Sequence, residues 1–356
     1  MNNSMEWLQA IAAINNQELI QHKYNFKNRF LDFIPTKIRN NHNHKTYDER
    51  WPMAVNALGA IWYHKLTSDE HTLIALKQAY NYQINQNGNW KKQIESVPQA
   101  MKGYSLIYLD QITQYPLYKI AIEEILNTLL FTLPRELDGC LPYNKMNQNL
   151  VDTLGMICPF LAKYSSSYGN SNALELSLNQ LKQFIEANID SDTHLPYHGY
   201  YADGAKRLGM HGWGRGTGWY ILGLIDTIVE VPKNHPNYCF LVESYISAAN
   251  SLRKFQREDG HWNWAIPLRV NKLDSSATSF IGYSILRGIK AGILDNSFST
   301  VTEKAIKGII EVTHPNGLID GSLSDCMGLG LYPNTFGPQP WLQGMATAFG
   351  SLYFAN

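Results

Sequence analysis

The sequence is poor in the features that mark several large classes of protein. It has four cysteines in 356 residues, Cys140, Cys158, Cys239 and Cys326, and no CxxC pair. Cysteines scattered in this way argue against a disulfide framework and a zinc site. No stretch comes near the roughly 20 apolar residues that a membrane-spanning helix needs. The segment Met1–Trp7 has no basic region before a long apolar core, so we expect no secretory signal and a cytoplasmic location.

An excess of charge of one sign is also missing. Thirty Lys and Arg residues balance 30 Asp and Glu residues. A balanced chain has no electrostatic reason to bind nucleic acid or a membrane surface. Neither a phosphate loop nor the Gly-x-Ser-x-Gly turn of serine hydrolases is present. No histidine pair combines helical spacing with a third ligand, so we expect no metal and no cofactor.

Aromatic residues are abundant, with 21 Tyr, 13 Phe and 9 Trp. Most of them should lie in the core, but a surplus of Tyr and Trp also fits stacking against carbohydrate. Hydrophobic residues make up 44% of the chain and charged residues 17%, as is usual for a soluble globular protein. No linker rich in Pro, Ser or charge divides the sequence. We therefore expect a single domain over residues 1–356.

Apolar residues recur at helical spacing along most of the chain and predict twelve helices. Their expected ranges are 4–21, 51–66, a third from Ser68, 97–109, 116–133, 149–164, 170–189, 215–230, 236–256, 275–291, 297–312 and 340–353. Strands are expected only as short hairpin arms in loops, at 140–143, 195–198 and 261–264.

Every second helix of this series begins beside unusual residues. These are Trp51, Glu95, Asp152, the segment 210–220, Asp274, and Gln339 to Trp341. The helices between them open with ordinary polar caps. This alternation predicts an all-α (α/α)6 barrel of six helical hairpins, in which the inner helices begin at one shared face. Helix N-termini carry partial positive charge, so that face would favour an anionic ligand.

The segment Met210–Tyr220 (MHGWGRGTGWY) contains four glycines, two tryptophans, one histidine and one arginine. Glycine lets a ligand approach the backbone closely, tryptophan offers a flat apolar face with one N–H donor, and arginine binds carboxylates through two donors at once. The combination suits a flat, anionic, hydroxylated ligand such as an acidic sugar. A tight turn between helices, with its tryptophans in the core, explains the same composition equally well.

Two carboxylates are candidates for acid–base chemistry. Asp152 lies in an apolar segment, and burial favours a protonated carboxylic acid, which a general acid must be. Glu95 comes at the start of another expected inner helix. If both carboxylates line one mouth, one can stay protonated while the other is ionised. For each, capping of a helix N-terminus is the simpler alternative. His198, which lies among tyrosines, could likewise be only a hydrogen-bonded loop residue.

Several segments, ordered along the chain from about residue 50 to its end, resemble a known enzyme family. They are His211–Trp219, Val151–Met156 followed by Pro159–Ala162, Gln256–Gly260 with Trp262, and the weaker matches Asp274–Thr278 and Gly337–Gly344. Together they resemble the unsaturated glucuronyl and rhamnogalacturonyl hydrolases, glycoside hydrolase families 88 and 105.

The resemblance implies an (α/α)6 barrel that removes a Δ4,5-unsaturated uronic acid from the non-reducing end of a lyase-generated oligosaccharide. In this family an Asp protonates C4 of the double bond and water adds at C5. The hemiketal then opens and expels the remaining sugar, and no glycosyl-enzyme forms, in contrast to retaining hydrolysis.

The resemblance also implies roles for individual residues. Asp152 matches the proton donor, while Glu95 falls where the family has a second Asp and so departs from the pattern. His198, Trp213, Arg215 and Trp219 match substrate-binding positions of the family, and we expect His211 and Trp51 to contribute to substrate binding as well. For Arg215 a structural role, tying the loop to a neighbouring carboxylate or carbonyl, is the alternative.

Two other functions stay open from the sequence. One is an inverting glycosidase acting on a saturated sugar, with carboxylates roughly 6.5–9.5 Å apart. The other is a sugar-binding protein with a degenerate site, which the departure at Glu95 would explain.

Overall fold

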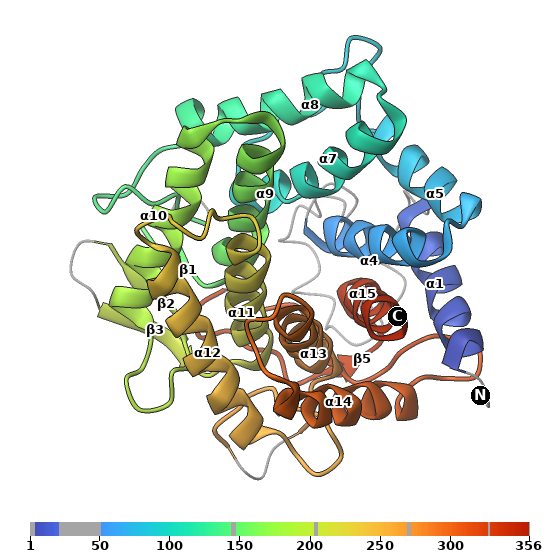
Figure 1. Cartoon of the computed structure of the whole chain (residues 1–356), viewed down its shortest axis with the longest axis vertical. Helices are drawn as coiled ribbons and strands as arrows, with labels where there is room; N and C mark the ends of the chain where they lie inside the picture. The colour runs from blue at the N-terminus through green and yellow to red at the C-terminus, as the bar shows by residue number, and fades with distance from the viewer. Residues whose placement is uncertain are drawn as a thin grey trace, which may run out of the picture.

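The structure is a computed structural model that describes residues 4–20, 51–143, 147–202, 206–268, 272–326 and 328–355. Its helices form two concentric rings (Figure 1). The inner ring consists of α4 (Trp51–Thr67), α6 (Val97–Ala100) with α7 (Lys102–Thr113), α9 (Asp152–Tyr168), α11 (Gly214–Ile228), α13 (Ser275–Lys290) and α15 (Pro340–Phe354). The outer ring consists of α1 (Ser4–Ile20), α5 (Glu70–Asn81), α8 (Pro116–Asn127), α10 (Ser171–Asn188), α12 (Tyr238–Phe255) and α14 (Ser299–Glu311). Because α15 packs against α4, the inner ring closes, and the expected (α/α)6 barrel is confirmed.

Inner and outer helices differ in how much of their surface is buried, in agreement with the hydrophobic pattern of the sequence. Every residue of α11 is buried, including its polar ones, because this inner helix has protein on all sides. The outer helices α10 and α14 bury one stripe each and leave their other face to solvent. None of the helices in the described ranges is long and apolar enough to cross a membrane.

The ring closes through a very close approach of α4 to α15. A Cβ atom added at Gly59 would lie 2.3 Å from the carbonyl oxygen of Gly344, and one added at Gly344 would lie 2.6 Å from that of Val55. Only glycine at both positions lets the two backbones touch. The contact also brings Trp51 and Trp341, at the start of each helix, to a ring-centroid distance of 4.9 Å.

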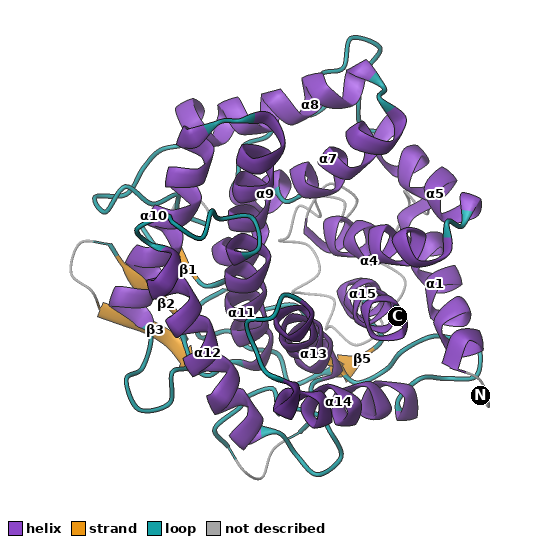
Figure 2. Ribbon diagram, viewed as in Figure 1, coloured by secondary structure: helices purple, strands orange, loops and turns teal. Residues whose placement is uncertain are grey.

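Two small antiparallel sheets lie among the loops (Figure 2). The first has the order β1 (Asn149–Leu150), β2 (Tyr197–Tyr201), β3 (Lys206–His211), and the second pairs β4 (Ser322–Leu323) with β5 (Phe336–Gly337). β1 runs directly into α9 and β3 into the turn before α11. The sheets therefore lie at the end of the barrel where these inner helices begin, which we call the mouth.

Some expected boundaries were wrong. The helix expected at 97–109 is interrupted at Met101, where the N–H of Tyr104 bonds three residues back to the Met101 carbonyl. The helix expected from 149 begins at Asp152, because 149–150 pair with β2. The last turn of 116–133 widens into the π-helix η3 (Thr128–Thr132).

The expected hairpin arms had mixed outcomes. The segment 195–198 overlaps β2, and 261–264 makes only an isolated bridge through Asn263. The segment 140–143 is not a strand, because the side chain of Gln180 accepts from the N–H of Leu141 and donates to its carbonyl in place of a partner strand.

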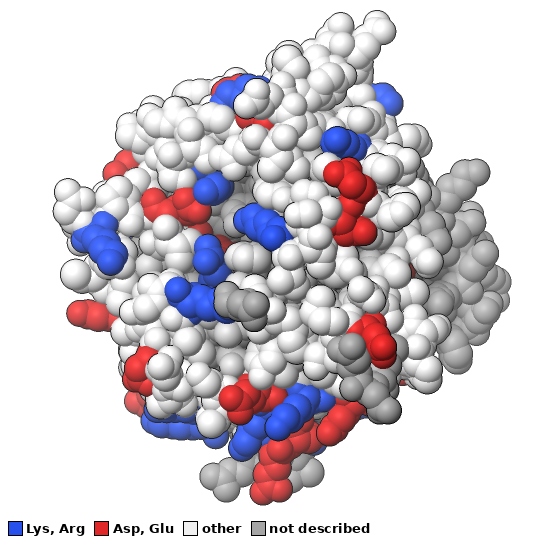
Figure 3. Space-filling view, turned by 45° about the vertical axis from the view of Figure 1, so that its right-hand side comes forward, with Lys and Arg blue, Asp and Glu red and all other residues white. Residues whose placement is uncertain are grey.

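The opposite end of the barrel is held by a buried carboxylate, Asp226 on α11. It accepts a hydrogen bond from the Tyr283 hydroxyl at 3.0 Å and one from Arg287 Nε at 3.4 Å, both on α13. Trp62 of α4 donates to the same Tyr283 hydroxyl at 3.0 Å. Burial raises the pKa of Asp226, and the Arg287 cation opposes that rise. On the face in Figure 3, basic and acidic side chains are interspersed.

Candidate functional site

Asp152 and His198 come together because β1 pairs with β2. Leu150 lies opposite Gly199 in this pairing, and the N–H of Val151 donates to the carbonyl of His198 at 2.8 Å. Asp152 is thereby placed at the first position of α9, where its Oδ2 lies 3.3 Å from Nε2 of His198. Both side chains are largely buried, with 12% and 3% of their surface exposed. The carboxylate therefore sits at a helix N-terminus beside an imidazole.

The imidazole of His198 is held on its other side by Tyr332. The Tyr332 hydroxyl lies 2.7 Å from Nδ1 of His198 and accepts a hydrogen bond from the N–H of Met210 at 2.9 Å. The ring of His198 also packs on Trp213, with 4.5 Å between the ring centroids. A continuous chain of contacts thus runs from Asp152 through His198 to Tyr332.

Tryptophans from three inner helices surround this part of the mouth. Trp51 of α4 lies 5.6 Å from Trp219 of α11 and 4.9 Å from Trp341 of α15, measured between ring centroids. The indole nitrogens of Trp213 and Trp219 are buried and have no hydrogen-bond partner in the described part of the chain, and the same holds for Oδ2 of Asp152. Buried polar groups are almost always paired. Oδ2 of Asp152 faces Nε2 of His198, so the two unpaired indole N–H groups are the donors at this end of the barrel that a polar ligand can satisfy.

Arg215 occupies the space between the tryptophans. Its two terminal nitrogens donate to the carbonyls of Leu323 and Ser324, at 2.8 Å and 3.1 Å. Its guanidinium carbon lies 5.0 Å from the ring of Trp213 and 5.2 Å from that of Trp341. Only 1% of Arg215 is exposed. This geometry favours the structural alternative, in which Arg215 ties β4 and the loop after it to the start of α11.

His211 lies outside the chain of contacts around Asp152. Its Nε2 lies 2.8 Å from the hydroxyl of Thr193, and its ring packs on Tyr197. Burial lowers the pKa of His211, so its imidazole is neutral at pH 7 and offers no cation to a uronate.

Glu95 is exposed and precedes α6, and its N–H donates to the side chain of Gln99 at 2.9 Å. Since α6 packs against α4 and α9, Glu95 lies on the mouth side of the barrel. Within the described ranges no contact joins its carboxylate to Asp152 or His198.

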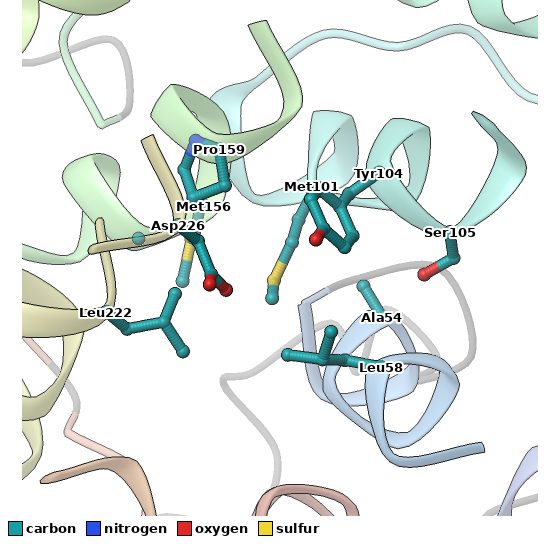
Figure 4. Close-up of a pocket in the computed structure, with 10 residues that line it drawn as sticks. Ala54, Leu58, Met101, Tyr104, Ser105, Met156, Pro159, Leu222 and Asp226 are labelled. Atoms are coloured by element: carbon teal, nitrogen blue, oxygen red, sulfur yellow. The ribbon is translucent and has the colours of Figure 1, made fainter. Parts of the chain in front are cut away.

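A cavity lies inside the inner ring and extends from the first turns of α4 and α9 to Asp226 of α11 (Figure 4). It is lined by Ala54, Leu58, Met101, Tyr104, Ser105, Gly155, Met156, Pro159, Leu222 and Asp226. Asp226 is the acid in this lining, and Tyr283 and Arg287 already bond its carboxylate. The mouth is therefore the better candidate site. Among the described residues, no group of three or more His, Cys, Asp or Glu side chains could hold a metal ion.

Tyr332 is the residue of this site that sequence reasoning missed. It lies in the loop between β4 and β5, and no motif surrounds it. Its sole signal was its position just before the weakly matching stretch Gly337–Gly344. Its partners, His198 and Met210, are 134 and 122 residues away in the chain, so no local pattern links them.

Residues 25–334 match the family model described as Glycosyl Hydrolase Family 88. The chain belongs to this family. Over 111 residues it is 32% identical to an unsaturated 3S-rhamnoglycuronyl hydrolase of Alteromonas sp. (strain LOR), which covers 30% of this chain and 27% of that protein. Over 110 residues it is 24% identical to a hydrolase of the same name from Formosa agariphila, covering 30% of this chain and 29% of that one. The chain thus spans less than a third of either relative's length.

The fold of this family 88 chain has close counterparts among solved structures. A possible member of the GH105 family from Klebsiella pneumoniae superposes with a TM-score of 0.87. The match covers 99% of this chain and 94% of that one, at 20% sequence identity. The likeness shows that the two proteins share the barrel.

Replacing Arg215 separates anchoring from substrate binding. We expect Arg215→Lys to lower the free energy of unfolding by about 1–3 kcal/mol, because one ammonium cannot reproduce the planar fork that bonds two carbonyls. We expect kcat/KM of the folded fraction to stay within about threefold of wild type, since no N–H aimed at substrate is lost. Urea unfolding and steady-state kinetics on one sample measure both.

Arg207→Lys is the matched control for this change. Arg207 also donates to a backbone carbonyl, that of Ile189 at 2.9 Å, but its side chain is 39% exposed. We expect its replacement to change stability by no more than about 0.5 kcal/mol. A loss of tenfold or more in kcat/KM for Arg215→Lys, at unchanged stability, would instead place Arg215 at the substrate.

Proposed function

We propose that this protein removes a Δ4,5-unsaturated uronic acid from the non-reducing end of oligosaccharides made by a polysaccharide lyase. The observation that carries the proposal is the buried contact of Asp152 with His198 among the tryptophans at the mouth. Membership of family 88 supports a glycoside hydrolase. The names of two curated relatives, both unsaturated 3S-rhamnoglycuronyl hydrolases, support the uronyl class of substrate.

Asp152 is the proton donor in this proposal. The electron pair of the C4=C5 bond takes the proton from the carboxylic acid, forming a C4–H bond and leaving positive charge shared by C5 and the ring oxygen. Water adds at C5 and returns a proton to the Asp152 carboxylate. The resulting hemiketal opens and expels the rest of the oligosaccharide. A group that first donates a proton and then accepts one acts as a general acid and then as a general base. Such catalysis increases the reaction rate on the order of 10²–10⁴-fold.

The surrounding groups suit the other parts of this substrate. The N-termini of α9 and α11 carry partial positive charge, which favours the uronate carboxylate. The unpaired indole N–H groups of Trp213 and Trp219 can donate to it or to sugar hydroxyls. Trp51 supplies an apolar wall, and neutral His211 lies at the edge of the site near Thr193. Arg215 contributes by holding the β4 loop against the tryptophans.

Two further points belong to the proposal. Glu95 is the candidate for the second carboxylate, on the mouth side of the barrel before α6. The cytoplasm is the expected location, because the four cysteines are unpaired and such thiols persist in a reducing compartment.

Turnover of lyase-generated disaccharides tests the function directly. We expect the wild-type protein to remove the near-ultraviolet absorbance of the C4=C5 bond for at least one member of a panel from pectin, glycosaminoglycans and bacterial exopolysaccharides. Asp152→Asn should bind the same disaccharide but lose at least about 10²-fold in kcat, because an amide cannot donate the proton to C4. An Asp152→Asn enzyme with more than a tenth of wild-type kcat would remove Asp152 from the mechanism.

The same assay yields two outcomes that would contradict the function itself. Cleavage of saturated disaccharides, with none of the absorbance loss, would select an inverting glycosidase. Tight binding of unsaturated disaccharides without turnover would select a sugar-binding protein.

Glu95→Gln tests the second carboxylate. We expect kcat to fall about 10- to 100-fold, less than for Asp152→Asn, because orienting the water contributes less than donating the proton. Glu70→Gln is the control, since Glu70 is also an exposed acid at a helix start but on the outer helix α5. If both glutamine variants keep wild-type kcat, Glu95 has no part in catalysis.

A further inference from the structure

The contacts of the Tyr332 hydroxyl favour one tautomer of the His198 imidazole. The Tyr332 oxygen already accepts a hydrogen bond from the backbone N–H of Met210, a group that can only donate. The hydroxyl keeps one hydrogen for its second neighbour, Nδ1 of His198, at 2.7 Å. Burial raises the pKa of Tyr332, so this hydrogen stays on the phenol throughout the neutral range.

An imidazole that accepts at Nδ1 must carry its hydrogen on Nε2, because a neutral ring has one donor nitrogen and one acceptor nitrogen. Nε2 of His198 is the atom that faces Asp152, 3.3 Å from Oδ2. The contact is too poorly aligned to be a full hydrogen bond in the free protein. Catalytic hydrogen bonds are often loose before substrate binds and tighten in the complex.

The two oxygens of Asp152 are not equivalent. Oδ2 is buried and faces His198. The 12% of the side-chain surface that remains exposed therefore belongs to its other atoms, and Oδ1 is the oxygen that a substrate can reach. When the contact tightens in the complex, Nε2–H points at Oδ2 and keeps the acidic hydrogen off that oxygen, since two hydrogens would meet there.

We propose that Tyr332 is a positioning residue for Asp152, acting through His198: its hydroxyl holds the imidazole in the Nε2–H form, which reserves Oδ1 of Asp152 for the transferable proton. This rests on the proposed function. The O–H bond at Oδ1 breaks as the C4–H bond forms from the electron pair of C4=C5, and Nε2–H then stabilises the new carboxylate at Oδ2. Water adding at C5 returns its proton to Oδ1, which restores the starting state.

The tautomer can be observed in the free protein without any substrate. In protein labelled with ¹⁵N-histidine, long-range ¹H–¹⁵N correlation spectra distinguish the two neutral tautomers and the imidazolium, and His198→Gln identifies the signals of His198. We expect the wild type to show the Nε2–H form alone. Tyr332→Phe keeps the ring beside Trp213 but removes the hydroxyl, so we expect a mixture of both neutral tautomers.

Kinetics then show whether the tautomer matters. We expect Tyr332→Phe to lower kcat about 3- to 10-fold with KM within about twofold, since a neutral hydrogen bond that orients the acid is lost while the substrate contacts remain. Tyr118→Phe is the matched control. It also removes a buried hydroxyl, which donates to Asn81 at 2.9 Å, but on the outer helix α8. It should leave kcat and the His198 spectrum unchanged.

Each contrary result has a distinct meaning. An Nδ1–H or imidazolium His198 in the wild type would overturn the inference even if the enzyme is active, and this result does not depend on the Tyr332→Phe variant. Equal losses of thermal stability in the two Phe variants, with kcat unchanged in both, would reduce Tyr332 to a structural role. Absence of turnover by the wild type on every unsaturated disaccharide would refute the proposed function and leave the tautomer assignment standing.

Discussion

The shared direction of the inner helices is the constraint on which the site depends. Each outer helix carries the chain back along the barrel, so every inner helix starts at the same end. The positive ends of α9 and α11 therefore meet at one mouth, together with Asp152, Trp51 and Trp213. The touching backbones of Gly59 and Gly344 close this ring. At the opposite end, the carboxylate of Asp226 is already bonded by Tyr283 and Arg287.

The two small sheets bring the residues of the candidate site together at the mouth. Pairing of β1 with β2 places the imidazole of His198 against Asp152, and the loop between β4 and β5 adds Tyr332 on its far side. Arg215 holds β4 in place from within the barrel. An acid held in this way is preorganised: its partners are set before substrate arrives and need not be reorganised during the reaction.

Outer helices such as α10 and α14 were predictable from the sequence because each repeats an apolar stripe over three or more turns. The alternation of unusual helix starts, such as Trp51 and Asp152, also located the inner ring. The sheets were not predictable, since strands of two to six residues carry too little periodicity and depend on distant partners.

Most residues of the candidate site could be predicted from the sequence, but their contacts could not. The motif around Trp213 and the acid at Asp152 were recognisable from their residue types alone. The partners of Arg215 are carbonyls 108 and 109 residues away, and any side chain can present a carbonyl, so sequence reasoning could only leave its two roles open. Tyr332 was missed for the same reason: its function comes from one hydroxyl reaching a distant imidazole.

The central claim is that Asp152 initiates hydration of a double bond and does not assist displacement at the anomeric carbon. The most direct measurement is to let the enzyme act on an unsaturated disaccharide in heavy water enriched in oxygen-18, and to analyse the released uronate by NMR and mass spectrometry. Hydration predicts deuterium at C4 and oxygen-18 in the carbonyl group formed at C5, with no solvent oxygen in the glycosidic position of the other sugar. Release of a uronate that still carries the C4=C5 bond, with no deuterium at C4, would contradict the account and show ordinary glycoside hydrolysis.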